Sequence, residues 1–199
     1  MQKRATLPRM YTVIKVLLAL FIGALIGVGL TWLAVFRATL PGGIADGPWH
    51  TSLAIGSAGG DMRTRAAVAL HGLLALSRDE TLYYNATTDS AGAALDGACT
   101  YTVTGRDPDA RWWSITAYGA DDYLIPNAAQ RYSVSKNSVV HDADASFRAT
   151  VSPTPAAQNW IALAPGRFSL TLRLYNPGAT VAADPAHAAL PAIRKESCR

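Results

Sequence analysis

Residues 168–175 read FSLTLRLY, the clearest strand pattern in the chain. Apolar side chains occupy every second position and alternate with polar or amphipathic ones: Phe168, Leu170, Leu172 and Leu174 against Ser169, Thr171, Arg173 and Tyr175. Successive side chains of an extended strand point to opposite faces of a sheet. The alternation therefore predicts a strand with one face in a core and a polar face away from it.

Similar runs recur between residues 80 and 152. They are rich in β-branched and aromatic residues, they are short, and Gly, Pro, Asp or Asn separate them: ETLYYNA (80–86), CTYTVTG (99–105), WWSITAY (112–118), RYSVS (131–135) and SFRATVS (146–152). No helical pattern lies between them, which disfavours a parallel α/β sheet. We expect a mainly β fold, a jelly-roll-like antiparallel β-sandwich.

One amphipathic helix is expected to precede the sandwich, over residues 61–77. Asp61 can cap its first turn, and an apolar stripe at helical spacing follows: Met62, Ala66, Ala69, Leu70, Leu73 and Leu76. Residues 37–60 are dense in Gly and Pro, so we expect a tether with one short strand near Leu53. Residues 61–199 are then the folded domain, with a loose C-terminal tail over 176–199.

Residues 16–36 contain no charge and predict a transmembrane helix, because about 20 apolar residues cross a bilayer. Lys3, Arg4, Arg9 and Lys15 precede it, which places residues 1–15 in the cytoplasm and exports the rest. The length favours an uncleaved signal-anchor over a cleaved signal peptide. Gly23 and Gly27 form a G-x-x-x-G pattern that would allow a homodimer through this helix, although glycine is common in membrane helices anyway.

The basic character of the chain belongs to its N-terminus. Five of the 18 Lys and Arg residues precede residue 38, which leaves 13 basic against 14 acidic residues in the exported part. Nucleic-acid binding is therefore disfavoured. We expect no metal and no cofactor, because phosphate-binding loops are absent and the four histidines lack metal-ligand spacing: His50, His71, His141 and His187.

Cys99 and Cys198 are the only cysteines, and the predicted topology places both on the oxidising side of the membrane. A disulfide between them is the favoured interpretation. Two free thiols and an intermolecular bridge through Cys198 remain alternatives.

Several motifs between Asp79 and Pro177 together resemble the bacterial domain of unknown function 1214. They are Glu80-x-x-Tyr83, Leu95-Asp96-Gly97, Trp113-Ser114-Ile115-Thr116-Ala117-Tyr118, Asn127, Asn159-Trp160, Pro165 and Leu172-Arg173-Leu174-Tyr175-Asn176-Pro177. The resemblance implies a jelly-roll-like sandwich, in some relatives alone behind a membrane anchor, and no established activity. In a bacterium the anchor would lie in the inner membrane and the main domain in the periplasm.

The chain departs from the family pattern at two turns. Ala145 stands where the family has Gly in Asp-Gly-Ser, and Ala does not readily adopt a positive φ. Asn159-Trp160-Ile161-Ala162 stands where the family has Asn-Trp-Leu-Pro.

Aromatic, amide and guanidinium side chains are the candidate ligand-binding residues: Trp113, Tyr118, Asn127, Asn159, Trp160, Arg173 and Tyr175. Rings stack on a sugar or an amphipathic ligand, and amides fix its orientation. Structural roles remain open for each. Trp113 and Tyr118 should face opposite sides of one strand, the two amides can cap turns, and Arg173 can pair with Glu80.

Three functions follow as hypotheses for this membrane-anchored exported module. The first is binding of a small molecule or glycan, or a structural role in the envelope. The second is a hydrolase or lyase acting on an envelope glycan or small amphiphile, with Glu80, Arg173 or Asp122 as acid–base groups. The third is a structural subunit of a membrane complex, which requires a contiguous apolar surface patch.

Overall fold

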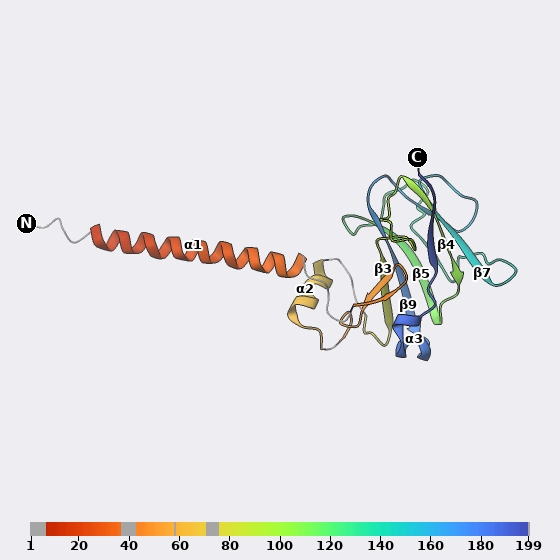
Figure 1. Cartoon of the computed structure of the whole chain (residues 1–199), viewed down its shortest axis with the longest axis horizontal. Coiled ribbons are helices and arrows are strands. Elements are labelled where there is room, and N and C mark those ends of the chain that lie inside the picture. The colour runs from red at the N-terminus through yellow and green to blue at the C-terminus, as the bar shows by residue number, and fades with distance from the viewer. Residues whose placement is uncertain (1–6, 37–42, 58, 71–75, 199) are drawn as a thin grey trace, which may run out of the picture. The chain divides into compact units, whose positions relative to one another are not determined.

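The computed structural model describes residues 7–36, 43–57, 59–70 and 76–198. The chain divides into two compact units, Met1–Thr39 and Leu40–Arg199. Figure 1 shows the helix of the first unit and the sheets of the second.

The first unit contains one helix, α1 (Leu7–Phe36). Its segment Met10–Ala34 has a mean hydropathy of 2.6 and no part of it is buried, so it is long and apolar enough to cross a membrane. The helix includes the predicted span 16–36 but begins earlier, within the predicted basic tail. Tyr11, Val13 and Ile14 are large exposed apolar side chains that extend the apolar surface in that direction.

The second unit is a β-sandwich of two sheets (Figure 1). The larger sheet contains, in spatial order, β1 (Gly43–Asp46), β2 (Trp49–Ser52), β3 (Thr81–Ala86), β9 (Phe168–Pro177), β5 (Ala110–Gly119) and β6 (Ser133–Ser135). The smaller contains β10 (Ala192–Cys198), β4 (Cys99–Arg106), β7 (Ser146–Ser152) and β8 (Trp160–Ala162). The predicted mainly β sandwich is confirmed, although β7 and β8 pair in parallel where antiparallel pairing was expected.

The core lies between the sheets and follows the predicted alternation. The four apolar residues of β9 are all buried: Phe168, Leu170, Leu172 and Leu174. Trp113 on β5 stacks on Phe147 of β7 with ring centroids 4.9 Å apart, and neither side chain is more than 1% exposed. This contact joins the two sheets across the core.

The predicted tether 37–60 is wrong over residues 43–52, which form the β1–β2 hairpin. Gly47 adopts a φ of 58° in the two-residue turn, so this glycine shapes a hairpin and does not merely interrupt structure. His50 of β2 pairs with Asn85 of β3, which attaches the hairpin to the larger sheet. The short strand expected near Leu53 lies just before that residue.

The C-terminal segment is ordered, which corrects the expected loose tail over 176–199. It contains α3 (Ala179–Ala183), a 3₁₀ turn at Pro185–His187, and β10, which pairs with β4. Tyr84 donates from its hydroxyl to the Pro185 carbonyl at 3.0 Å. Burial raises the pKa of Tyr84, and the charges of Asp46 and Asp184 raise it further, so the hydroxyl remains a donor at neutral pH.

The predicted disulfide is present. Cys99 opens β4 and Cys198 ends β10, and the two sulfurs are bonded. The bond closes the strand pair at the end of the sandwich opposite α3 (Figure 1). A disulfide of this kind is typical of an oxidising compartment.

The predicted helix 61–77 is shorter in the structure. Helix α2 covers Met62–Leu70, and residues 71–75 lie outside the described residues. Asp61 caps it as predicted, because its carboxylate accepts from Thr64 N at 2.8 Å. The expected apolar stripe is wrong at Met62, which is 86% exposed, and at Ala69 and Leu76, which are also exposed. Thr64, outside the stripe, is buried.

Ala145 has a φ of 63°, at the turn where the resemblance implied a glycine. An L-residue in this left-handed region costs about 1–2 kcal/mol, which glycine avoids. Because glycine also raises the entropy of the unfolded chain, we expect Ala145→Gly to raise the free energy of unfolding by about 0.5–1 kcal/mol. Urea denaturation measures it. Ala143→Gly, at an exposed position without a positive φ, should destabilise slightly, and equal effects of the two variants would contradict the argument.

Candidate functional site

The larger sheet carries a cluster of polar side chains on the face that points away from the smaller sheet. We call it the polar face, and it consists of Tyr83, Asn85, Ser114, Thr116, Tyr118, Thr171 and Arg173. The register brings residues of three strands into rows across it. Arg173 pairs with Tyr83 on one side and Ser114 on the other, and Thr171 likewise lies between Asn85 and Thr116.

Arg173 lies at the centre of the polar face and is partly buried. Its guanidinium donates to the Tyr118 hydroxyl at 2.8 Å and to the Thr116 hydroxyl at 3.4 Å, and its central carbon lies 5.4 Å from the Tyr118 ring centroid. No carboxylate of the described residues forms an ion pair with it. A guanidinium has five N–H donors, so this one retains donors after both contacts.

Hydroxyl groups around Arg173 are mostly withdrawn from solvent. Ser114, Thr116 and Thr171 are each less than 9% exposed, and Thr171 donates to the Asn85 side-chain oxygen at 2.7 Å. The Thr81 hydroxyl, next to this row on β3, is buried and has no hydrogen-bond partner among the described residues. Buried hydroxyls are costly unless they find partners, so this surface is unusual for the outside of a sandwich.

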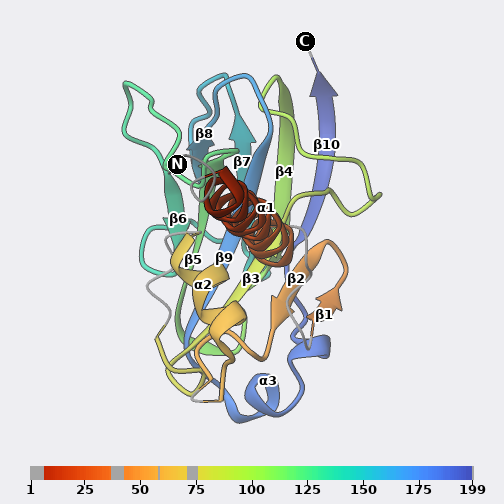
Figure 2. The ribbon, with the colours of Figure 1, turned by 90° about the vertical axis from the view of Figure 1, so that its left-hand side faces the viewer.

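Helix α2 lies on the same side of the larger sheet, as Figures 1 and 2 both show. After the helix, Leu76 N donates to the Tyr83 hydroxyl at 3.2 Å, which ties the returning chain to the polar face. Arg78 N donates to the Gly56 carbonyl, so the chain before helix α2 and the chain after it are hydrogen-bonded to each other.

The two predicted amides serve turns and do not join the polar face. Asn159 accepts from Val140 N at 2.8 Å and donates to the carbonyls of Val140 and Arg148. Asn127 donates to the Ile125 carbonyl and accepts from Arg131 N. Every such contact is to backbone, as the turn-capping alternative requires.

Removal of the Asn159 amide should therefore destabilise the fold. Asn159→Ala leaves three backbone groups without their partner and places Ala at a φ of 46°, so we expect a loss of about 2–3 kcal/mol in the free energy of unfolding. Asn159→Gly removes the same bonds without the φ strain and should lose about 1 kcal/mol less. Urea denaturation of both variants tests this. An Asn159→Ala protein with the free energy of unfolding of wild type would show that these hydrogen bonds do not stabilise the fold.

The predicted aromatic residues separate into three places. Trp113 lies in the core, on the opposite side of β5 from Tyr118, so it is not available to a ligand on the polar face. Trp160 belongs to the smaller sheet and donates from its ring nitrogen to the Ser152 carbonyl at 3.1 Å. Tyr175 shares the outer side of β9 with Arg173 and packs edge-on against Trp112 with ring centroids 5.2 Å apart. Of the seven candidates, the structure brings together Tyr118, Arg173 and, in the adjacent row, Tyr175.

The candidate acid–base groups do not converge on Arg173. Glu80 is exposed just before β3, and its backbone carbonyl accepts from Asn176 N at 2.7 Å. Asp122 is exposed in the loop after β5. The Glu80–Arg173 pair proposed from the sequence does not form. Across the described part of the chain, no group of three His, Cys, Asp or Glu side chains is placed to hold a metal ion.

Sequence reasoning missed most of the polar face. Asn85, Ser114, Thr116 and Thr171 carry no recognisable chemical motif, and only their position in the alternation places them beside Arg173. The alternation within each strand shows which residues point away from the core. Only the order of the strands in the sheet shows that the outward residues of β3, β9 and β5 are neighbours.

Two solved structures resemble the sandwich. The VPA0106 protein of Vibrio parahaemolyticus is 22% identical over 68% of this chain and 35% of its own length, with a TM-score of 0.58. An uncharacterised protein from Burkholderia cenocepacia is 22% identical over 60% of this chain and 30% of its own, with a TM-score of 0.44. The chain thus matches about a third of either protein, and the first likeness supports the fold alone. No curated protein matches the sequence.

The family model described as "Protein of unknown function (DUF1214)" matches residues 80–179. This range coincides with the motifs from Glu80 to Pro177, and it confirms the resemblance drawn from them. Because the match covers half of its length, the chain belongs to the DUF1214 family.

Proposed function

We propose that the protein is a single-span protein of the bacterial inner membrane whose periplasmic sandwich binds a small acidic molecule or an acidic glycan. The proposed topology rests on the four basic residues before the apolar helix and on the positive-inside rule. The Cys99–Cys198 bond supports an oxidising compartment for the sandwich, and the length of α1 supports an uncleaved signal-anchor.

The observation that carries the binding proposal is the state of Arg173. Its guanidinium is partly buried, donates to two neutral hydroxyls, and has no carboxylate partner among the described residues. A partly desolvated cation is stabilised by an anion that it can bond directly, and Arg presents a planar fork that fits carboxylate or phosphate. Tyr118 and Thr116 fix the direction of this fork.

The surroundings favour a ligand that also carries hydroxyls. Thr81 has an unsatisfied hydroxyl, and Asn85 and Ser114 add polar groups in the rows beside Arg173. The Trp112–Tyr175 pair borders these rows and supplies ring surface on which a sugar can pack. This combination supports an acidic sugar over a purely apolar anion.

Calorimetric titration of the full-length protein in lipid nanodiscs with glucuronate tests the proposal. Glucuronate should bind, and Arg173→Met should weaken binding at least about tenfold, because a charge-assisted contact is lost. Arg194→Met removes an exposed arginine of β10 and should leave affinity unchanged. Glucose, which lacks the carboxylate, should bind at least about tenfold more weakly than glucuronate. Equal affinity of wild type and Arg173→Met, or no binding to either, would reject the polar face as an anion site.

A further inference from the structure

A groove lies at one end of the larger sheet, between the loop after β5 (119–126) and the segment before β9 (164–167). Its volume is about 350 Å³, which falls at the lower end of the range for small-molecule pockets. The groove shares no lining residue with the polar face as defined above. It therefore offers a second and separate surface.

Hydrogen bonds fix the first wall of the groove. Gly119 N donates to the Tyr123 carbonyl at 2.9 Å, and Asp122 N donates back to the Gly119 carbonyl at 3.0 Å. Asn127 donates from its amide to the Ile125 carbonyl at 3.1 Å and holds the end of the loop. The loop is thus closed on itself before any ligand binds.

Gly97 fixes the second wall, the segment 164–167. Its N–H donates to the Gly166 carbonyl at 2.7 Å. A Cβ at position 97 would lie 1.8 Å from the Ala164 carbonyl oxygen, so any other residue would displace this wall. Asp96 also pairs with Arg167 in an isolated bridge, which attaches the same segment to the second wall.

The lining combines an apolar surface with one unpaired cation. Leu124, Ile125, Pro126, Ala164 and Pro165 supply the apolar part. Leu124 is 43% exposed, which is unusual for a large apolar side chain in the described part of the sandwich. Arg167 is exposed, and no ion pair joins it to an acid in the described ranges. Asp121 also lines the groove, but its carboxylate already accepts from Tyr123 N.

We propose that this groove binds a single-chain amphiphile with a carboxylate head. The chain would cover the apolar surface between Leu124 and Pro165, and the carboxylate would bond the Arg167 guanidinium. The volume limits the chain to a short or medium length. Burial of an otherwise exposed apolar groove drives binding, and Arg167 selects acids over neutral amphiphiles. The groove and the polar face use different cations and different segments of the chain. Either proposed site can therefore be rejected while the other stands.

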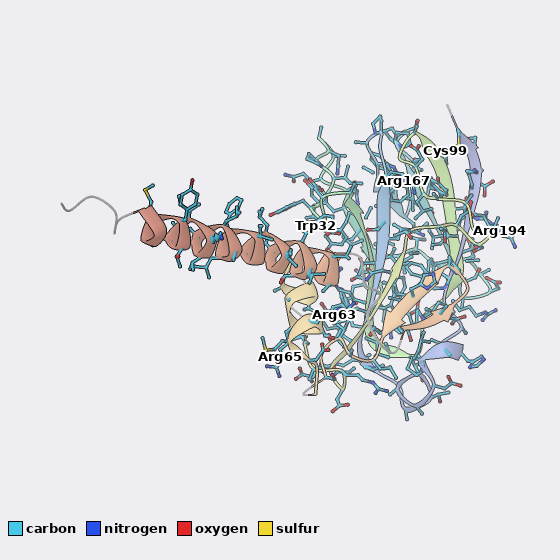
Figure 3. The ribbon with its side chains drawn as sticks, turned by 60° about the vertical axis from the view of Figure 1, so that its left-hand side comes forward. Trp32, Arg63, Arg65, Cys99, Arg167 and Arg194 are labelled. Atoms are coloured by element: carbon cyan, nitrogen blue, oxygen red, sulfur yellow. A yellow bond between two sulfur atoms is a disulfide. The ribbon has the colours of Figure 1, made fainter. Side chains whose placement is uncertain are left out.

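Photolabelling of the full-length protein in phosphatidylcholine nanodiscs tests the proposal, with a diazirine-bearing decanoate as the probe. We expect peptide mass spectrometry to find the label within residues 119–126 and 164–167. Decanoate should suppress labelling, and decanol should need an at least about tenfold higher concentration. Arg167→Gln should reduce labelling at limiting probe about tenfold, whereas Arg194→Gln, on β10 of the other sheet (Figure 3), should not.

Asp121→Asn provides a second variant at an exposed position. This substitution removes a negative charge that would repel the carboxylate of the probe. We therefore expect Asp121→Asn to be labelled at least as strongly as wild type. Label outside the two segments, equal suppression by decanol and decanoate, or unchanged labelling of Arg167→Gln would overturn the proposal. Arg173→Met should label like wild type. Loss of labelling in Arg173→Met together with Arg167→Gln would show that the two surfaces form one site and overturn their separation.

Discussion

Loss of the Cys99–Cys198 disulfide is expected to lower the free energy of unfolding of the sandwich by roughly 4–5 kcal/mol. The two cysteines are 99 residues apart, so the bond closes a loop that contains most of the sandwich. Without the bond the unfolded chain has more conformational entropy, which stabilises the unfolded state. This effect on the free energy of unfolding grows with the length of the loop. The native contacts change less, because β10 remains paired with β4 through hydrogen bonds and through buried Ile193.

The double variant Cys99→Ser/Cys198→Ser should show this loss in urea denaturation, and wild type unfolded in the presence of a reductant should match it. Hydrogen exchange should also quicken for amides of residues 192–198, at the edge of the smaller sheet. Wild type in oxidising buffer, with the bond verified by mass, is the reference. An unchanged urea midpoint in the double variant would mean that the disulfide does not restrain the unfolded chain.

Trp49→Ala is expected to lower the free energy of unfolding by about 3–5 kcal/mol. Trp49 opens β2 and is fully buried in the core cluster. Its ring nitrogen donates to the Pro191 carbonyl at 2.7 Å, which joins the N-terminal hairpin to the segment just before β10. Truncation would leave a cavity at a point where the two ends of the folded unit meet.

Trp49→Phe is the matched control for this prediction. It keeps most of the ring volume and removes only the hydrogen bond to Pro191, so we expect a loss of about 1–2 kcal/mol. Thermal and urea unfolding of both variants measure the difference. A Trp49→Ala protein within about 0.5 kcal/mol of wild type would show that the hairpin is peripheral, as the sequence first indicated.

The sequence predicted the elements whose pattern is local. The alternation of β9 correctly assigned Leu172 to the core. The odd spacing on β5 placed Trp113 and Tyr118 on opposite faces without showing which of the two is buried, and Trp113 is the buried one. The hairpin at 43–52 was missed because Gly47 and Pro48 were interpreted as a loop, although two residues at this spacing also form a hairpin turn. The partner that makes Trp49 a core residue lies 142 positions away. No local window contains that contact.

The C-terminal strand was missed for a related reason. In β10 only Ile193 is buried, and Arg194, Lys195 and Glu196 are exposed, as is common for an edge strand. A strand with so little apolar alternation is difficult to distinguish from a tail. The cysteine pair was the one signal that linked this segment to β4, and it predicted the disulfide without predicting the strand.

The polar face shows the same limit. Parity placed Arg173 and Thr171 away from the core, but only the order β3-β9-β5 brings them beside Asn85 and Tyr118. Chemical type alone selected Asn127 and Asn159, and both are occupied by backbone groups. Side chains with spare hydrogen-bonding capacity, such as those of Arg173 and Thr81, are recognised only once their partners are known.

Native mass spectrometry of the full-length protein, released from bacterial membranes, tests both the membrane anchor and the anion site in one spectrum. We expect an intact chain with its N-terminal helix, the mass deficit of one disulfide, and a bound acidic small molecule. The bound mass should be lost in Arg173→Met and retained in Arg194→Met. A chain without its N-terminal helix, or with two free thiols, would contradict a membrane-anchored domain on the oxidising side of the membrane. The same bound mass in Arg173→Met as in wild type would contradict the polar face as the binding site.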